Sequence, residues 1–258
     1  MARTSIRWAF SDVMTVAQRD LIGLIRIPTA VVFAFVQPVM FVLLFRYVLG
    51  SAISGTNTGG YVNFLIPGIL VQTTLFGAVG TAIGLAEDLQ KGLIERFRAL
   101  PMTRLAVLGG RTVADLARNV IVLLVITGMG FLVGFRPHGG FAAYVAGALI
   151  MLTFSYGLSW GFAYIGLAAP NSETAQAMAF PLLFPLSFAS SVFVPLYKMP
   201  GWLQAFARNQ PVSQVTNAVR SLMLGYPVGN SVWLSLAWMV GLFAVLIPLS
   251  TARYRRAG

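Results

Sequence analysis

The chain lacks cysteine and is poor in charged residues. Without cysteine it can have no disulfide framework, no thiolate nucleophile and no cysteine metal site. Charged residues make up 10% of its 258 positions and hydrophobic residues 57%, whereas a soluble domain has about 25% charged residues. This composition predicts a membrane protein and leaves no room for a separate soluble domain.

Histidine and acidic residues are also scarce, which disfavours several classes of chemistry. The single histidine, His138, precedes two glycines and is predicted to lie in a solvated outer turn, so no metal site is expected. The seven acidic residues fall at predicted cytoplasmic positions or span ends, whereas ion-coupled transporters usually keep ionisable residues inside their spans. No G-x-x-x-x-G-K-[ST] sequence occurs, so the chain has no P-loop for nucleotide phosphates.

Apolar runs long enough to cross a bilayer, about 20 residues each, occupy most of the chain. They predict an all-α polytopic membrane protein whose six spans lie at about 27–49, 62–85, 115–135, 141–168, 175–197 and 231–252. The fifth run is interrupted by Pro181, Pro185 and Pro195. Such breaks are tolerated in membranes where protein or a water-filled cavity satisfies the freed carbonyl groups.

Three segments outside the spans have patterns of their own. Residues 1–26 carry apolar side chains at helical spacing and predict an amphipathic helix on the cytoplasmic membrane surface, although a frayed basic leader stays open as an alternative. Residues 199–226 predict two short helices that form a re-entrant or interfacial hairpin on the outer side. Residues 253–258 form a cytoplasmic tail, and no cleaved signal is expected.

The positive charges predict the orientation. Thirteen of the 18 Lys and Arg residues fall on the side of the N-terminus, which places both termini in the cytoplasm by the positive-inside rule. The net charge of +11 is explained by this orientation and by anionic lipid, so no nucleic-acid partner is predicted.

The sequence EDLQKGLIERFRALP, residues 87–101, gathers charge between two long apolar runs. Its leucines and Phe97 recur at helical spacing, its charged residues occupy another face with pairs of opposite sign, and Pro101 ends the helix. We predict a docking helix whose apolar stripe packs on the spans and whose charged face meets a soluble partner. A solvated juxtamembrane helix that only supplies positive charge is the alternative.

The sequence GLSWG, residues 157–161, matches the G-x-S-x-G pattern of a hydrolase. That chemistry requires a histidine and an acid beside the serine, yet Ser159 lies in the middle of a predicted span and His138 in an outer turn. We therefore predict no catalytic residue. The small residues here, in GTAIG at 80–84 and in GFLVG at 130–134 are expected to let helices approach closely.

Two long stretches carry a family resemblance. The first, EDLQKGLIERFRALPMTRLAVLGGRTVADL, is similar to the cytoplasmic loop of ABC-2 type permeases. The second, residues 180–225 with their MPGWL sequence and Arg220, resembles the C-terminal signature of the same family, although the usual Asn-Pro reads NQP. QPVMFVLLFRYVLG and FLIPGIL also fit, so the similarity covers nearly the whole chain and looks most like the daunorubicin-resistance type.

The resemblance implies a transmembrane subunit, not itself an enzyme, that exports amphiphilic compounds such as drugs or lipids from a bacterium across its cytoplasmic membrane. Its implied partners are a second permease copy and two ATP-binding subunits, which bind the ATP and Mg²⁺. The family's coupling role is carried over to Glu87, Asp88, Lys91, Glu95, Arg96 and Arg98. The candidate substrate pathway comprises Gln72, Phe76, Phe180, Phe184 and Phe188. An apolar path of this kind suits a hydrophobic, shape-tolerant substrate.

Three alternatives stay open at this point. Within the family, the cargo could instead be lipid-linked polysaccharide. An ion-driven secondary transporter would work without an ATPase partner. An intramembrane enzyme would depend on a reactive cluster and would be inactivated by Ser159→Ala.

Overall fold

The computed structural model describes residues 6–26, 28–49, 58–93 and 106–256. Within these ranges the regular elements are helical and no residue belongs to a strand, as the sequence predicts. The α-helices are α1 (Ile6–Ile25), α2 (Pro28–Leu43), α4 (Thr58–Gln90), α6 (Ala106–Leu132), α7 (Gly140–Ala168), α8 (Ser172–Phe188), α9 (Gly201–Asn209), α10 (Pro211–Leu224) and α11 (Ser231–Arg256). A π-helical turn, η1 (Leu44–Leu49), continues α2, and a short 3-10 turn, η2 (Leu196–Lys198), precedes α9.

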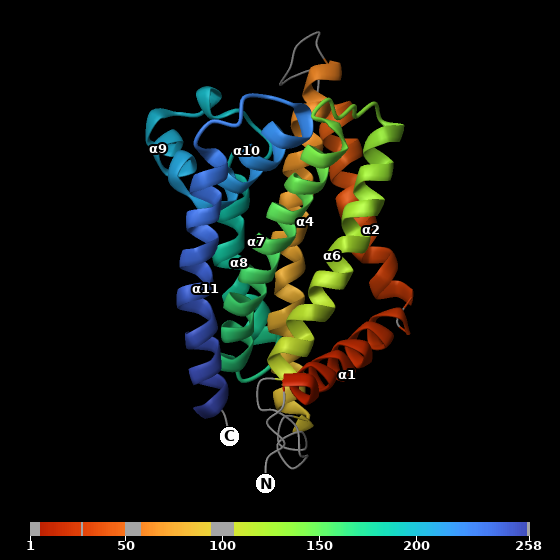
Figure 1. The fold of residues 1–258 in the computed structure, drawn as a ribbon, viewed down its shortest axis with the longest axis vertical. Helices are drawn as coiled ribbons and strands as arrows, with labels where there is room; N and C mark the ends of the chain where they lie inside the picture. The colour runs from red at the N-terminus through yellow and green to blue at the C-terminus, as the bar shows by residue number, and fades with distance from the viewer. Residues whose placement is uncertain (1–5, 27, 50–57, 94–105, 257–258) are drawn as a thin grey trace.

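The long helices run side by side along the longest axis of the molecule (Figure 1). Four of the described helices, α4, α6, α7 and α11, are long and apolar enough to cross a membrane. Helices α2 and α8 run alongside them and are shorter. Helix α1 crosses the bundle at one end, here named the α1 end, and α9 and α10 lie at the opposite end, here named the α10 end.

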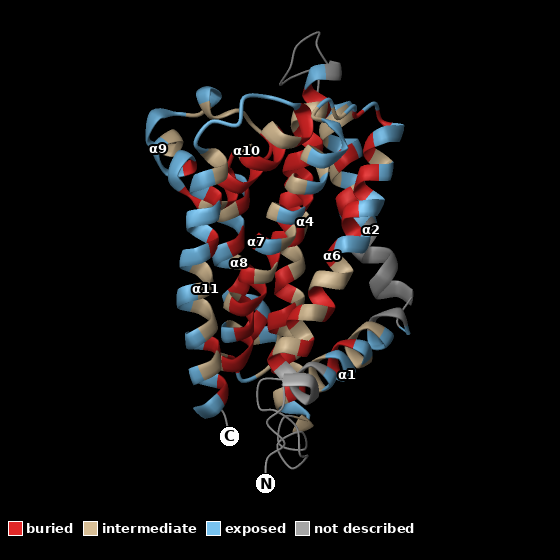
Figure 2. Cartoon of the chain, viewed as in Figure 1, coloured by how far each residue is buried: buried red, intermediate tan, exposed pale blue. Residues whose placement is uncertain are grey.

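Helix α4 is the centre of the bundle. Its leucine and isoleucine side chains between Leu65 and Leu75 are fully buried and pack with Phe154 of α7, Leu183 of α8 and Val215 of α10. Helix α11 instead exposes most of its apolar side chains along its length (Figure 2). A helix that is apolar all round yet exposed on one side fits contact with lipid, which satisfies apolar side chains as protein does.

Aromatic side chains gather near the α10 end. Tyr197, Trp202, Tyr226 and Trp233 are all exposed there, in or beside η2, α9, α10 and the first turn of α11. Tryptophan and tyrosine are enriched at the boundary between membrane and water, because their rings are apolar at one edge and polar at the other. These residues therefore mark one boundary of the membrane-embedded part.

Two short helices, α9 and α10, occupy most of residues 199–226. Arg220 fastens α10 to the bundle: its guanidinium donates to the carbonyl oxygens of Phe64, at 3.0 Å, and Ser191, at 2.9 Å. It also lies over the Phe64 ring, with Cζ 3.6 Å from the ring centroid. A buried guanidinium is tolerated only when its donors are satisfied, so these contacts fix the position of α10 against α4.

The fifth apolar run is shorter than predicted. The helix was expected to extend over 175–197, but α8 ends at Phe188. The chain leaves the helix because its backbone finds other partners: the Ser191 N–H donates to Ser213 Oγ of α10 at 3.0 Å. The carbonyl of Val192 also lies so close to Gly68 of α4 that a Cβ there would overlap it.

The third span begins earlier than predicted, at Ala106 instead of near Asp115, and ends at Leu132. The added turns contain two adjacent glycines, Gly109 and Gly110. They are helical because α6 packs closely on α1 here: a Cβ on Gly110 would lie 2.5 Å from Cβ of Val16. Helix α1 therefore packs against this part of α6.

The helix predicted over 87–101 is not continuous in its described part. Helix α4 extends to Gln90, and a turn at Lys91 and Gly92 follows, with Gly92 at φ +65°. This left-handed conformation ends α-helices and favours glycine. Residues 94–105, which include Glu95, Arg96 and Arg98, lie outside the described residues.

Candidate functional site

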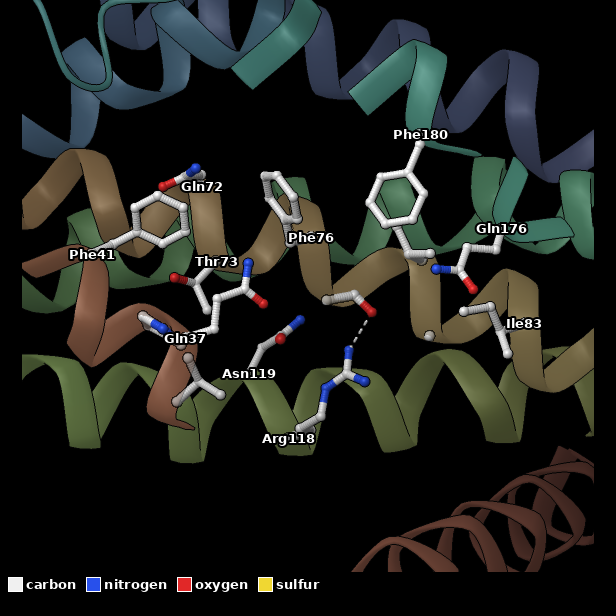
Figure 3. Close-up of a pocket in the computed structure, with 15 residues that line it drawn as sticks. Gln37, Phe41, Gln72, Thr73, Phe76, Ile83, Arg118, Asn119, Gln176 and Phe180 are labelled. Carbon is white, nitrogen blue, oxygen red and sulfur yellow. Dashed lines mark hydrogen bonds between the residues drawn. The ribbon is translucent and has the colours of Figure 1, made fainter. Parts of the chain in front are cut away.

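A cavity of about 330 Å³ opens between α2, α4, α6 and α8. Its volume lies at the lower end of the range of small-molecule sites. Apolar side chains form much of its wall, among them Phe41, Phe76, Ile83 and Phe180, as Figure 3 shows. The cavity therefore has the size and apolar character of a site for a hydrophobic group.

Polar side chains from four helices also line this cavity. They are Gln37 of α2, Gln72 and Thr73 of α4, Arg118 and Asn119 of α6, and Gln176 of α8 (Figure 3). The Gln72 side chain is 2% exposed, and its Nε2 atom has no hydrogen-bond partner among the described residues. A buried donor without a partner costs stability, so an unmade hydrogen bond at this position points to a ligand group or water in the cavity.

Arg118 is held by a groove of glycines on α4. Its Nη2 donates to the carbonyl oxygen of Gly77 at 2.6 Å and lies 3.2 Å from Oδ1 of Asp115, whose other oxygen accepts from Thr81. A Cβ on Gly77 would lie 2.9 Å from this guanidinium, and so would a Cβ on Gly80. The glycines therefore make room for an arginine inside the bundle, and its charge is balanced by a carboxylate that does not line the cavity.

A second arginine of α6 packs against glycines of α4 in the same way, closer to the α1 end. Arg111 of α6 occupies the place where a Cβ of Gly84 would be, and its Nη2 donates to the Gly80 carbonyl at 3.2 Å. The GTAIG sequence thus does permit close approach, but of arginine side chains. The GLSWG glycines instead pack against Phe243 and Leu246 of α11.

A series of stacked phenylalanines leads from the cavity toward the α10 end. Ring centroids are 5.6 Å apart between Phe180 and Phe184 and 5.7 Å between Phe184 and Phe188. The series continues from Phe188 to Phe193 at 5.6 Å, and Phe193 stacks on Phe45 of η1 at 4.3 Å. These rings form a continuous apolar track along α8, and we call these five residues the phenylalanine track.

The structure brings most of the predicted pathway residues together. Gln72, Phe76 and Phe180 line the cavity. Phe184 and Phe188 do not line it, but Phe184 contacts Phe76 edge-on with ring centroids 6.2 Å apart. The predicted set therefore lies in the cavity and the track next to it.

At the α1 end, four charged side chains from three helices form a network. Arg19 of α1 lies 2.6 Å from Asp20 and 3.1 Å from Asp88 of α4. Arg111 of α6 lies 3.6 Å from Asp88 and 3.8 Å from Asp20. We call these four residues the charge network. It joins α1 to the end of α4, which precedes the 94–105 segment, and to the start of α6, which follows that segment.

The charge network stabilises the charged form of Arg19. Burial by itself lowers the pKa of Arg19, but hydrogen bonds to Asp20 and Asp88 and the attraction of both carboxylates outweigh it, so the pKa is raised above its ordinary value. Two arginines and two aspartates leave the network with no net charge. That balance is what allows these groups to sit partly buried.

The predicted coupling residues that the structure describes are placed in two ways. Glu87 and Lys91 form an exposed pair, with Lys91 Nζ 3.1 Å from Glu87 Oε2. Asp88 does not face outward with them: its side chain is 11% exposed and belongs to the charge network. It therefore links α4 to α1 and α6 and is not available on an outer docking face.

Sequence reasoning missed several cavity residues. Gln37 and Asn119 lie inside apolar helices, and a polar residue at such a position is itself a signal of an intramembrane site.

Ser159 is buried and donates to the Ser155 carbonyl at 3.2 Å, while His138 is exposed in the loop before α7. Across the described ranges, no three His, Asp or Glu side chains form a group that could hold a metal ion.

Comparison with known proteins places this arrangement in a family. The model of the ABC-2 type transporter family matches residues 11–224. The chain is 35% identical over 247 residues to the daunorubicin resistance ABC transporter permease protein DrrB1 of Streptomyces coeruleorubidus, covering 96% of this chain and 87% of the relative. It is 28% identical over 229 residues to the probable doxorubicin resistance permease DrrC of Mycobacterium tuberculosis, covering 88% and 82%. It is also 24% identical over 226 residues to the putative transport permease ycf38 of Porphyra purpurea, covering 86% and 75%. The chain therefore belongs to the ABC-2 type transporter family, as a multi-pass membrane permease.

Proposed function

We propose that this permease exports amphiphilic compounds, drugs or lipids, across the cytoplasmic membrane of a bacterium, with energy from separate ATPase subunits. The observation that carries the proposal is the cavity and its continuation into the phenylalanine track toward the α10 end. An apolar wall with a few polar groups suits a molecule that has both characters. The names of two relatives, which refer to daunorubicin and doxorubicin resistance, support cargo of this kind.

The proposed orientation places the α1 end in the cytoplasm and the α10 end outside. The excess of Lys and Arg at the α1 side supports this, as does the amphipathic α1, which crosses the bundle there. In this arrangement α2 with η1, α4, α6, α7, α8 and α11 are the six crossings. The cavity then lies within the membrane, and the phenylalanine track leads outward.

The proposed assembly pairs this chain with a second permease copy and two ATPase subunits, which hold the ATP and Mg²⁺. The substrate path would run along the seam between the two permeases. Phe184 and Phe188 support this, since each is 46% exposed on α8 although the track continues from them into the bundle. Apolar groups at such a seam are covered by the partner copy or by cargo.

Coupling is proposed to pass from the ATPase through residues 87–101 to the charge network. Glu87 and Lys91 are exposed at the end of α4, where a soluble chain can reach them. Asp88, four positions before Gly92, transmits movement of that segment to α1 and α6 through Arg19 and Arg111. The bundle then alternates between inward and outward access, with α8, α9 and α10 forming the outer gate.

The test is ATP-dependent transport in inside-out membrane vesicles that contain the permease and its ATPase chain. A fluorescent amphiphile should accumulate when ATP is added and should still accumulate when an ionophore collapses the proton gradient. Phe180→Trp, which fills the cavity, should lower the rate of uptake several-fold. Phe131→Trp is the matched control, because Phe131 is exposed on the surface of α6 and does not line the cavity.

Two results would contradict the proposal. Uptake that stops with the ionophore and ignores ATP would identify an ion-driven transporter. Uptake that depends on ATP but is equal in the wild type and in Phe180→Trp would show that cargo does not pass through this cavity.

A further inference from the structure

The polar lining of the cavity carries little charge. Among the described residues that line it, Arg118 alone is charged, and none is an aspartate or glutamate. The remaining polar groups are the amides of Gln37, Gln72, Asn119 and Gln176 and the hydroxyl of Thr73. Amides and a hydroxyl can hydrogen-bond a neutral head group, whereas a cation has no carboxylate to pair with.

We infer that the cavity takes amphiphiles whose head group presents hydrogen-bond acceptors and carries no positive charge. This inference rests on the proposed function and narrows it by the chemistry of the head group. It names neutral and anionic acceptor groups, such as hydroxylated rings, sugars or carboxylates, as the favoured chemistry.

The first support is the free donor of Gln72. Its Nε2 is buried beside the cavity with no hydrogen-bond partner among the described residues, so an acceptor atom placed there gains a bond without breaking an existing one. An ammonium head group has no acceptor for this N–H and leaves it unpaired. Figure 3 shows Gln72 beside the cavity together with Phe41 and Thr73.

The second support is the position of Arg118. Its guanidinium lies at the cavity wall, and the carboxylate that balances it, Asp115, is on the same helix three residues earlier and outside the lining. A head group in the cavity therefore meets the positive partner of this pair first. In a site of low dielectric that order favours an acceptor or an anion and disfavours a cation.

The test compares three fluorescent probes with one dodecyl chain and different head groups: a tertiary amine, a carboxylate and a neutral glucoside. Binding is measured to the full-length permease, with its ATPase chain, in phosphatidylcholine nanodiscs, because a lipid surface without net charge does not concentrate either ion. We expect the glucoside and the carboxylate to bind about ten-fold more tightly than the amine, the worth of a hydrogen bond and a charge contact. This comparison needs only the wild-type protein.

Variants assign the effect to the residues. Gln72→Leu should weaken the glucoside and the carboxylate by about three-fold to ten-fold, and Arg118→Gln should remove the advantage of the carboxylate. Gln72→Glu, which keeps the shape of the side chain, should reverse the order and favour the amine. Gln204→Leu on α9 removes an amide that does not line the cavity, so it should leave all three affinities unchanged.

The outcomes separate this inference from the proposed function. If the amine binds as tightly as the other probes, and Phe180→Trp abolishes all binding, the cavity is the site but the head-group preference is refuted. If none of the three probes binds, both the proposed function and the inference are overturned.

Discussion

Replacing Asp88 by asparagine removes one carboxylate from the charge network and leaves two arginines with a single aspartate. Arg19 and Arg111 lie 3.1 and 3.6 Å from Asp88, and its side chain is 11% exposed. Breaking a fully buried ion pair costs about 3–5 kcal/mol, and an exposed pair contributes about 0–1 kcal/mol. Because Arg19 is 37% exposed and water can solvate it, we expect a loss of about 1–2 kcal/mol in the attachment of α1.

Hydrogen exchange measures this attachment directly. If α1 opens more easily by about 1–2 kcal/mol, its protected amides should exchange about 5- to 30-fold faster in detergent or nanodiscs. The central amides of α4, buried in the bundle, should not change. Glu87→Gln is the matched control, since it removes a carboxylate one position away whose pair with Lys91 is exposed on both sides.

A double variant tests whether charge balance is the cause. Asp88→Asn combined with Arg111→Gln again leaves the network with equal numbers of positive and negative groups, and it should recover part of the lost protection. If exchange in α1 is the same in the wild type and in Asp88→Asn, the charge network does not hold α1 to the bundle and cannot transmit movement to it.

Three further predictions follow from other contacts. Arg220→Met leaves the carbonyl oxygens that Arg220 binds without a donor, at a cost of about 1–3 kcal/mol for each buried group. The melting temperature of the purified permease should therefore fall by several degrees. An unchanged melting temperature would show that Arg220 does not hold α10. Gly84→Ala displaces the Arg111 guanidinium and should speed hydrogen exchange in α1, as Asp88→Asn does. Gly128→Ala is the control and should be neutral or slightly stabilising, because a Cβ there meets nothing within 4 Å. Equal effects of the two changes would argue against the glycine groove. Ser159→Ala should keep full transport activity, because the hydroxyl only donates to a backbone carbonyl of its own helix, and complete loss of transport would revive an enzymatic role.

The described architecture could largely be predicted because hydrophobic runs dominate the sequence. The hairpin of α9 and α10 was also predictable, since Pro211 interrupts an amphipathic pattern between the two helices. The errors arose where tertiary contacts override local pattern. Gly109 and Gly110 lie before the predicted start of the third span, yet they belong to α6 and let it approach Val13 and Val16 of α1.

The site was only partly predictable for a related reason. Phe76 and Phe180 were candidates because the family resemblance implies a path along their two helices. Arg19 and Asp88 are 69 positions apart, and nothing in the sequence indicates that they meet. The same holds for Arg118 and Gly77, because a glycine that accommodates an arginine reads in the sequence as one that lets two helices approach.

The most direct test of the account is purification of this permease from native membranes under mild detergent, with identification of the chains that co-elute and assay of ATPase activity. The account predicts a nucleotide-binding subunit in stoichiometric amount and ATPase activity that amphiphiles stimulate. It also predicts that replacing both Glu87 and Glu95 by lysine abolishes co-elution without preventing membrane insertion. A permease that elutes alone, under conditions that preserve other membrane complexes, would contradict the central claim that a separate ATPase drives export.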